Sequence, residues 1–257
     1  MTIWNADQYL KFADHRARPG LELLARIPID APSSVWDLGC GAGNLTAALR
    51  ERWSRARIVG LDNSPEMLAK ARKIAGIEWI ECDLVGWSAP EPADVVFSNA
   101  VLHWVPDHAR LFAHLMRQVA PGGALAVQMP RNFAARSHTA LYETAREPAW
   151  AAALAPLLGP TPVAAPAQYY EWLKPHAAAV DVWETEYLQV LTGDDAVVEW
   201  TRATAVKPFL DALPSAQREP FLAAYRARLA PAYPRRDDGT TLFAFRRLFI
   251  VALAPAR

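Results

Sequence analysis

The chain has 257 residues, 52% of them hydrophobic and 21% charged, which is enough for one sizeable globular domain. Its 27 Lys and Arg residues balance its 27 Asp and Glu residues, so the net charge favours neither nucleic acid nor an anionic membrane as a partner. Two cysteines exclude a disulfide framework and a paired-cysteine zinc motif, and the charged start of the chain lacks a signal-peptide core, so we expect a cytoplasmic protein.

Helical and strand-like segments alternate over the first half of the chain. Helical spacing occurs at 5–12 and at 19–29, where Pro19 is well placed to begin the second helix. Ser64 and Pro65 are expected as the N-cap and the first-turn proline of a later helix. The alternation is typical of βαβ units and a parallel sheet. Buried strands are predicted at 34–38, 57–62, 77–82, 93–100 and 124–130, and helices between them at 44–53, 63–75 and 107–120.

The alternation ends after residue 130. Segments rich in alanine and proline, with helical patches, replace it, and two strand-like segments interrupt them. We interpret these strands as further members of the same sheet and the helical segments as a cap over the substrate site. The whole chain, residues 1–257, is expected to form one domain. Its core is expected to comprise 1–130 and strands near 179–191 and 241–254, and its cap 131–178 and 192–240.

The stretch VWDLGCGAGN contains three glycines, and the question is which ligand would approach a backbone without side chains at this point. Gly39, Gly41 and Gly43 follow a predicted strand and open a helix, which is the context of a nucleotide site. The dinucleotide fingerprint has a glycine where this chain has Asn44, and a P-loop is excluded because no Gly-Lys-Ser/Thr follows. Asp37 inside the strand would repel a phosphate and suits a ligand that carries a cation.

Two further acids follow the next two strands. Asp62 ends one strand, and Asp83 comes just after the other. Because parallel strands end at the same edge of a sheet, both acids are expected beside the glycines, where ribose hydroxyls are bound in such folds. A nucleoside with an amino-acid tail and a positive centre fits this set better than NAD.

Four of these motifs resemble a known family. VWDLGCGAGN, GLDNSPEML, ECDL and FSNAVLHWVPD are similar, in order and spacing, to the S-adenosylmethionine-dependent methyltransferases with a seven-stranded Rossmann-like core. WNADQYLKF, RPGLELLARI, LAVQMPRNF, YYEWL, FRRLFIVA and the segment 200–213 resemble the trans-aconitate 2-methyltransferase family over nearly the whole chain. The resemblance implies an α/β fold with helices on both faces of a mostly parallel sheet. It also implies that S-adenosyl-L-methionine is the cofactor and that the methyl acceptor is a carboxylate of a small polycarboxylic acid. Trans-aconitate is the first candidate for this acid.

The resemblance also assigns cofactor contacts. The methionine part would lie over Gly39, Cys40 and Gly41, with Asp37 near its ammonium and Asn99 at its end. Asp62 would bind the ribose, and Asn63, Met67, Cys82, Asp83 and Leu84 would surround the adenine. An N-terminal helix with Tyr9, Phe12 and Arg16 would close over the cofactor as a lid.

The acceptor side is assigned in the same way. His103 and Trp104 would lie where the methyl group emerges, and a tryptophan face attracts a cation by roughly 0.5–2 kcal/mol. Gln128 would face the reacting carboxylate. The resemblance places the substrate against Arg16, Arg131, Asn132, Tyr169, Tyr170, Lys207 and Arg247. The chain departs from the family pattern at Arg131, Lys207 and Arg246, where Asp, Arg and Pro are expected, and these departures leave the exact acid open.

Two other functions remain open at this point. The same fold could methylate a different small-molecule oxygen or nitrogen with His103 as a general base, or the chain could bind the cofactor without catalysis. A carboxylate acceptor needs no base, because it is already ionised at neutral pH. No metal is expected, since the reaction needs none and no cluster of His, Cys and acids suggests one. The residues leave open which carboxylate reacts and how many copies assemble.

Overall fold

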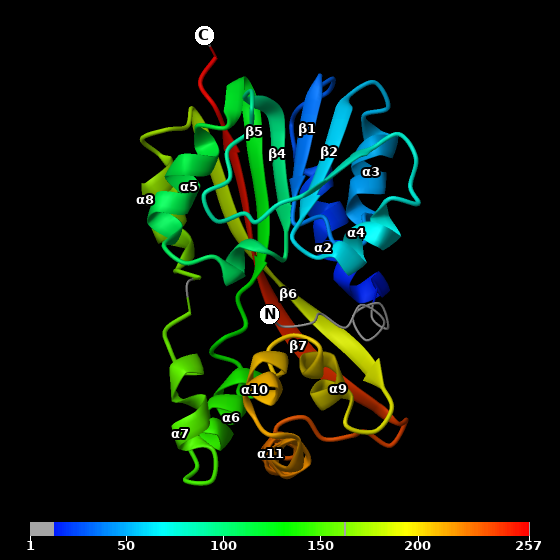
Figure 1. Ribbon diagram of the computed structural model, residues 1–257, viewed down its shortest axis with the longest axis vertical. Helices are drawn as coiled ribbons and strands as arrows, with labels where there is room; N and C mark the ends of the chain where they lie inside the picture. The colour runs from blue at the N-terminus through cyan, green and yellow to red at the C-terminus, as the bar shows by residue number, and fades with distance from the viewer. Residues whose placement is uncertain (1–12, 162, 257) are drawn as a thin grey trace. The chain divides into compact units, whose positions relative to one another are not determined.

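The computed structural model describes residues 13–161 and 163–256 (Figure 1). Its strands are β1 (Ser34–Leu38), β2 (Arg57–Asp62), β3 (Glu78–Glu81), β4 (Ala93–Asn99), β5 (Val119–Pro130), β6 (Ala179–Thr192) and β7 (Thr240–Leu253). Its helices are α2 (Ala13–Ala25), α3 (Asn44–Arg52), α4 (Pro65–Ala71), α5 (His108–Met116), α6 (Arg136–Ala145), α7 (Ala151–Leu154), α8 (Pro166–Leu173), α9 (Ala196–Arg202), α10 (Lys207–Ala212) and α11 (Ser215–Leu229). Two 3₁₀ turns, η1 (Leu102–Trp104) and η2 (Ala155–Leu157), complete the described elements.

The strands form one seven-stranded sheet in the order β3-β2-β1-β4-β5-β7-β6. Strands β1 to β5 are parallel, and β7 pairs with β5 in the antiparallel sense. The central strands β1 and β4 are buried along most of their length, as expected for parallel strands with helices on both faces of the sheet. The predicted α/β class and the mostly parallel, Rossmann-like seven-stranded sheet are confirmed.

Local signals located some boundaries and missed others. Ser64 caps α4 by accepting a hydrogen bond from Met67 N, and Pro65 lies in its first turn, as predicted. Pro19 lies inside α2 instead of starting it, so that prediction was wrong. The helix predicted over 107–120 ends at Met116, because Val119 already pairs with β4 as the first residue of β5.

Two compact units make up the described chain. The sheet unit comprises residues 14–130, 163–185 and 247–256, and the helical unit comprises residue 13, 131–161 and 186–246. The sheet unit therefore includes α8, which the predicted cap had contained, because Tyr169 of α8 packs edge-on against Phe112 of α5. Strands β6 and β7 contribute residues to both units. That the whole chain is one domain stays a prediction.

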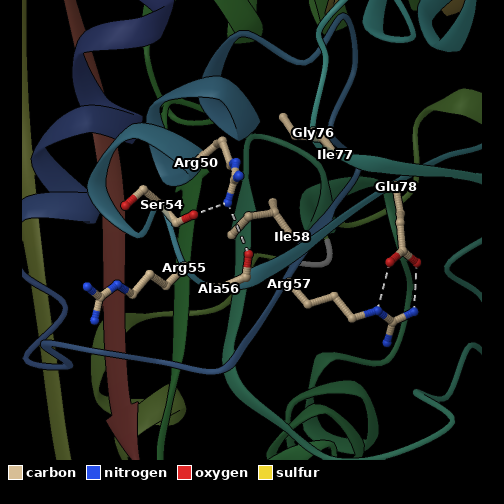
Figure 2. Close-up of a pocket in the computed structure, with 9 residues that line it drawn as sticks. All are labelled: Arg50, Ser54, Arg55, Ala56, Arg57, Ile58, Gly76, Ile77 and Glu78. Carbon is tan, nitrogen blue, oxygen red and sulfur yellow. Dashed lines mark hydrogen bonds and ion pairs between the residues drawn. The ribbon is translucent and has the colours of Figure 1, made fainter.

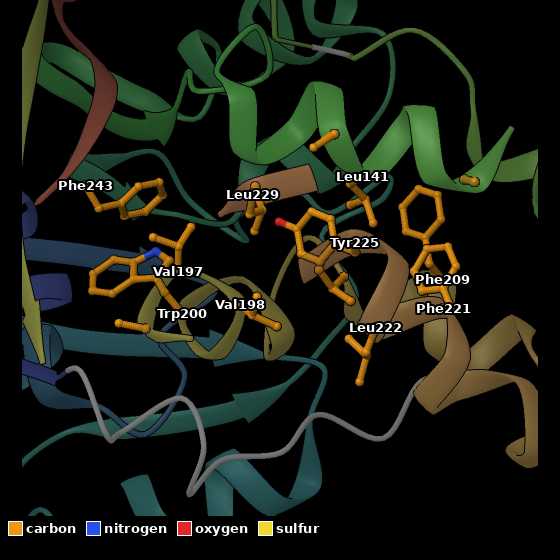
Figure 3. Close-up of a cluster of buried hydrophobic side chains, with 14 of the residues drawn as sticks. Leu141, Val197, Val198, Trp200, Phe209, Phe221, Leu222, Tyr225, Leu229 and Phe243 are labelled. Carbon is orange, nitrogen blue, oxygen red and sulfur yellow. The ribbon is translucent and has the colours of Figure 1, made fainter. Parts of the chain in front are cut away.

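The helical unit has a hydrophobic core of its own (Figure 3). Phe221 of α11 is fully buried, stacks with Phe209 of α10 and meets Trp150 edge-on. Trp200 of α9 packs against Phe243 of β7. The apolar faces of short helices, which are marginal alone, are buried together in this cluster. None of the helices in the described part of the chain is both long enough and apolar enough to cross a membrane.

Candidate active site

The carboxyl ends of the parallel strands bring the predicted cofactor motifs together. The turn after β1 is tied to the end of β2, because Gly39 N and Cys40 N both donate to Leu61 O at 2.8 Å. The neighbours of β1 are β2 on one side and β4 on the other, so the strand order reverses at β1. In open α/β sheets ligands bind in the crevice at such a switch point.

The glycines of this turn serve two different needs. Gly39 has a φ of 75°, and a Cβ there would lie 2.3 Å from the side chain of Val101. Gly41 has a φ of 56°, and a Cβ there would meet nothing within 4 Å. Gly39 is therefore required by packing, whereas Gly41 borders open space into which a ligand can approach the backbone.

Asp62 is held by the turn that it faces. Its Oδ2 accepts a hydrogen bond from Gly41 N at 2.8 Å, and its Oδ1 accepts one from Ser64 N at 2.9 Å. Burial raises the pKa of this carboxyl, while the backbone hydrogen bonds lower it. An ionised carboxylate has about four acceptor positions, so both oxygens can still accept a hydrogen bond from a pair of vicinal hydroxyls.

Asp37 lies deeper, on β1, and has a partner that the sequence analysis missed. Thr46 Oγ1 of α3 donates to Asp37 Oδ2 at 2.6 Å, and both side chains are buried. Burial raises the pKa of Asp37 to about 7, and the charge of Asp62 adds to this effect. The available signal was the polar Thr46 three residues before the buried Leu49, on the face of α3 that packs inward.

The cysteine beneath the turn is not a nucleophile. Cys40 is buried, and burial raises the pKa of its thiol far above the ordinary range. A Cβ at Gly60 would lie 2.5 Å from the Trp79 ring and 3.1 Å from the Cys40 sulfur, so this glycine leaves room for both side chains. A buried protonated thiol acts as a small hydrophobic group.

The adenine-side predictions fall around the end of β2 and β3. Cys82 N donates to Asp62 O at 3.0 Å, which places the segment after β3 beside Asp62. Asp83 is exposed, and its Oδ1 accepts a hydrogen bond from Val85 N at 2.9 Å. Of the remaining predicted residues, Asn63 is exposed, Leu84 is half-buried and Met67 is buried in α4.

The ends of β4 and β5 carry buried polar atoms with no hydrogen-bond partner in the described part of the chain. Asn99 and Gln128 are register neighbours, and Ala100 N donates to Gln128 O at 2.9 Å. Asn99 Oδ1 and Gln128 Nε2 are both buried, and neither has a hydrogen-bond partner among the described residues. Because an unmet buried polar atom is costly, these two atoms suit a polar ligand. The predicted roles of Asn99 at the cofactor and of Gln128 at the acceptor stay predictions.

A buried cation adjoins this pair. Arg247 of β7 is only 4% exposed, and its Nη1 donates to Gln128 Oε1 at 3.3 Å. The neighbouring Arg246 is exposed and pairs with Glu186 at 3.4 Å. Since successive strand residues face opposite sides of a sheet, only Arg247 of the two arginines points to the side of Gln128.

His103 and Trp104 lie on η1, the turn that follows β4. Their rings are 4.6 Å apart, and Trp104 is 51% exposed. Tyr169 and Tyr170 both lie on α8. Tyr169 is fully buried with its hydroxyl 2.5 Å from His108 Nδ1, whereas Tyr170 is exposed beside Lys174.

The other predicted substrate residues belong to the helical unit or lie outside the described residues. Asn132 uses its amide within the helical unit, since its Oδ1 accepts from Arg246 N and its Nδ2 donates to Ser137 Oγ. Lys207 Nζ pairs with Asp211 at 3.0 Å, and Arg131 N donates to Arg246 O. Tyr9, Phe12 and the side chain of Arg16 lie outside the described residues.

A separate pocket of about 580 Å³ opens at the amino end of β2, the opposite end from Asp62 (Figure 2). Two of its three arginines are already engaged. Arg57 makes two hydrogen bonds to Glu78, at 2.8 and 2.7 Å, and Arg50 donates to the carbonyls of Ser54 and Ala56. The described residues also contain no cluster of three or more His, Cys, Asp or Glu side chains that could hold a metal ion.

Comparison with known proteins gives the family. A family model described as a methyltransferase domain matches residues 35–123. Over 254 residues the chain is 48% identical to a trans-aconitate 2-methyltransferase of Azoarcus sp. (strain BH72), covering 98% of this chain and 100% of the relative. It is 47% identical to a protein of the same name from Methylobacterium nodulans, covering 98% of each.

A solved structure supports the fold. Haemonchus contortus phosphoethanolamine N-methyltransferase 2, in complex with S-adenosyl-L-methionine, matches with a TM-score of 0.54 at 19% identity, covering 93% of this chain and 53% of that one. At this identity the likeness concerns the fold alone. The identity to the two curated relatives over almost their entire length decides the family: the chain belongs to the trans-aconitate 2-methyltransferase family and is an S-adenosylmethionine-dependent methyltransferase.

Proposed function

We propose that this enzyme methylates one carboxylate of trans-aconitate, or of a closely similar polycarboxylic acid, to give a monomethyl ester and S-adenosylhomocysteine. The observation that carries the proposal is the 48% identity to a trans-aconitate 2-methyltransferase along the whole of that relative. The buried Arg247 lies beside Gln128, whose Nε2 has no hydrogen-bond partner among the described residues, and this pair is the feature of the site that favours an anionic acceptor.

The proposed cofactor contacts follow the carboxyl edge of the sheet. Asp62 would accept hydrogen bonds from both ribose hydroxyls, since each of its oxygens keeps acceptor capacity beyond its backbone partner. The backbone at Gly39, Cys40 and Gly41 would lie beneath the methionine part, with Asp37 and Asn99 nearby. The adenine would lie among Asn63, Met67, Cys82, Asp83 and Leu84. S-adenosylmethionine supplies an electrophilic methyl group on its sulfonium.

On the acceptor side, the proposed role of the residues is to bind and orient the acid. A carboxylate is ionised at neutral pH and needs no general base. Gln128 Nε2 would donate one hydrogen bond to the reacting carboxylate, and Arg247 would bind a second carboxylate of the same molecule. Trp104 would offer its ring face to the cationic centre, an attraction of roughly 0.5–2 kcal/mol. Alignment of the two reactants can supply up to roughly 7–11 kcal/mol of the rate enhancement.

The other predicted acceptor contacts remain part of the proposal. Arg16, Arg131, Asn132, Tyr170 and Lys207 are proposed around the remote carboxylates, by likeness to the family. Tyr169 is a weaker candidate, because its hydroxyl is already bonded to His108 and to Ala164 N. Tyr9 is proposed as a cofactor contact on the same ground of likeness. His103 would donate a hydrogen bond to the acceptor.

We further propose that the enzyme works in the cytoplasm on a free small molecule, with no nucleic acid or membrane as partner. The balanced charge of 27 basic and 27 acidic residues supports this, because it provides no long-range field toward a polyanion. Both cysteines are free thiols, which suits a reducing compartment.

Release of S-adenosylhomocysteine across a panel of mono-, di- and tricarboxylic acids tests the proposal. We expect trans-aconitate to give the highest kcat/KM and mono-acids to be poor substrates. An amine or alcohol preferred over every acid would contradict the carboxylate assignment. The rate with such an acceptor would then fall by roughly 10²–10⁴ in a His103→Gln variant, the usual scale for loss of a general base.

A further inference from the structure

The turn that carries His103 and Trp104 cannot hold its shape alone. It is a single 3₁₀ turn closed by two hydrogen bonds, from Trp104 N to Val101 O at 3.0 Å and from Val105 N to Leu102 O at 2.9 Å. Short 3₁₀ turns have poor hydrogen-bond geometry and little stability of their own. Ala100, two residues before the turn, and Asp107, three residues after it, have positive φ values of 57° and 53° without being glycine. Such conformations persist only when surrounding contacts impose them.

One side chain reaches back onto the turn. His108, the first residue of α5, is buried, and its Nε2 lies 3.0 Å from Leu102 O. A carbonyl can only accept, so Nε2 carries the proton and donates to Leu102 O. The carbonyl of Leu102 therefore receives two hydrogen bonds, one from within the turn and one from α5.

The other nitrogen of the imidazole is fixed by α8. His108 Nδ1 lies 2.5 Å from the hydroxyl of Tyr169, and Ala164 N donates to the same hydroxyl at 3.1 Å. In the neutral tautomer with the proton on Nε2, Nδ1 is an acceptor, so the tyrosine hydroxyl donates to it. A continuous chain of hydrogen bonds therefore runs from Ala164 through Tyr169 and His108 to Leu102.

Packing locks the two rings in place. Phe112 lies edge-on to Tyr169, with ring centroids 4.8 Å apart, and 5.5 Å from His108. Figure 1 shows α5 and α8 side by side, so residues some sixty positions apart meet here. Burial lowers the pKa of His108, which keeps the imidazole in the neutral form that the chain of hydrogen bonds needs.

We propose that His108 and Tyr169 are positioning residues for methyl transfer, which hold the Leu102–Trp104 turn so that His103 and Trp104 face the reacting groups. The inference rests on the proposed function for its catalytic part, and it gives Tyr169 a role different from substrate binding. Neither His108 nor Tyr169 needs to touch the substrate.

The test is Tyr169→Phe, which keeps the ring and removes only the hydroxyl. Hydrogen–deuterium exchange followed by mass spectrometry reads the amides of Trp104 and Val105 directly. We expect exchange at these amides to accelerate and kcat to fall by up to about tenfold, the size expected for one buried hydrogen bond. The cofactor Kd and the substrate KM are expected to change less than kcat, since Asp62 and Arg247, the charged groups proposed to bind the ribose and the acid, do not lie on this turn.

Two matched variants sharpen the result. Tyr225→Phe removes an equally buried hydroxyl, which donates to Ser137 O in the helical unit, and should leave exchange at Trp104 and Val105 unchanged. His108→Gln keeps a donor near the position of Nε2 and should protect the turn better than His108→Leu. A variant that unfolds is recognised by loss of its thermal transition, and His108→Gln then carries the test.

Two results would overturn the inference. One is unchanged exchange at Trp104 and Val105 in folded Tyr169→Phe, and the other is faster exchange with an unchanged kcat. If the wild-type enzyme forms no ester with any acid, the proposed function fails instead. The exchange measurement uses no substrate, so it still decides whether the pair holds the turn.

Discussion

At the scale of single residues, Asp62 shows how one carboxylate can serve the fold and a ligand together. Its two oxygens accept hydrogen bonds from the backbone amides of Gly41 and Ser64. These bonds fix the orientation of the carboxylate and therefore of its remaining lone pairs. A ribose that presents two adjacent hydroxyls would find both acceptors already oriented. Such preorganisation reduces the entropy lost on binding.

We expect Asp62→Ala to weaken binding of S-adenosylmethionine by more than tenfold, because hydrogen bonds to charged groups contribute roughly 1.5–3 kcal/mol. Isothermal calorimetry on the folded variant measures this. Glu81→Ala is the matched control, since Glu81 is the register partner of Asp62 on β3 and is exposed. Equal affinities for wild type and a folded Asp62→Ala would refute the ribose assignment.

The buried Asp37 predicts a pH dependence of stability. Its pKa is raised by burial from 3.8 to about 7 in the folded protein, so the folded state binds more protons than the unfolded state between these values. Stability is therefore lost as pH rises from about 4 to about 7. Asp37→Asn keeps an acceptor for Thr46 and removes the titration. Thermal melts should show the variant gaining on the wild type across this window and levelling off above it; parallel curves would contradict the assignment.

The buried arginine carries a prediction about substrate. Arg247→Met should raise the KM for a tricarboxylate by well over tenfold and leave cofactor affinity unchanged, because removing one member of a desolvated charge pair costs about 2–5 kcal/mol. Arg246→Met is the matched comparison, since Arg246 is exposed and pairs with Glu186. Wild-type kinetics in a folded Arg247→Met variant would show that this residue does not bind the acid.

Residue types predicted part of the site, and tertiary contacts supplied the rest. The motifs around Asp62 and Gly41 could be recognised in the sequence, because each is a short stretch with a distinctive residue: a glycine that permits a positive φ, or an acid at the end of a strand. The partners of Asp37 and His108 were not, since Thr46 and Tyr169 reach them through packing between separate elements. The resemblance had chosen Arg247 over Arg246 as a substrate residue, and the strand adds a physical reason, because it alternates their side chains between the two faces of the sheet.

At the scale of elements, the turn after β1 is the decisive piece of backbone. Gly39 and Gly41 share a positive φ but differ in surroundings, because a Cβ would collide with Val101 only at Gly39. Substitution by alanine at each position therefore distinguishes the packing role of Gly39 from the proposed binding role of Gly41.

Gly39→Ala should lower the thermal midpoint strongly, because steric overlap adds to the left-handed backbone strain of roughly 1–2 kcal/mol. Gly41→Ala should carry the strain alone and fold, but its methyl group would project into the space proposed for the cofactor and weaken its binding. Differential scanning calorimetry and cofactor titration of the pair check this. Equal losses of stability, or full cofactor affinity in Gly41→Ala, would contradict the assignment.

Strands were the elements best predicted from sequence. The predicted bounds of 34–38 and 57–62 match β1 and β2, because buried parallel strands are short apolar runs between turn residues. The ends of helices were predicted less accurately than the ends of these two strands. Spacing extended the helix after Asp107 too far, since pairing between Val119 and Ala93 overrides helical periodicity. Pro19 signalled a helix start by its type, whereas α2 continues through it.

At the scale of the whole molecule, the predicted site residues and the second hydrophobic core belong to different units. The sheet unit holds Asp62, Gln128, Arg247 and the turn with Trp104, and the helical unit buries a core around Phe221 and Trp200. The sequence predicted a helical insertion, but not that α8 joins the sheet unit through His108 and Tyr169. Composition alone does not show which of several alanine-rich helices packs on the sheet.

Methylation of a carboxylate is tested most directly by the product. The wild-type enzyme, incubated with trans-aconitate and S-adenosylmethionine bearing a deuterated methyl group, should form a single deuteromethyl ester, identified by mass spectrometry and NMR. Alkaline hydrolysis should return trans-aconitate and deuterated methanol. A base-stable N- or C-methyl product, or cofactor turnover without label in the acid, would contradict carboxylate methylation by this enzyme.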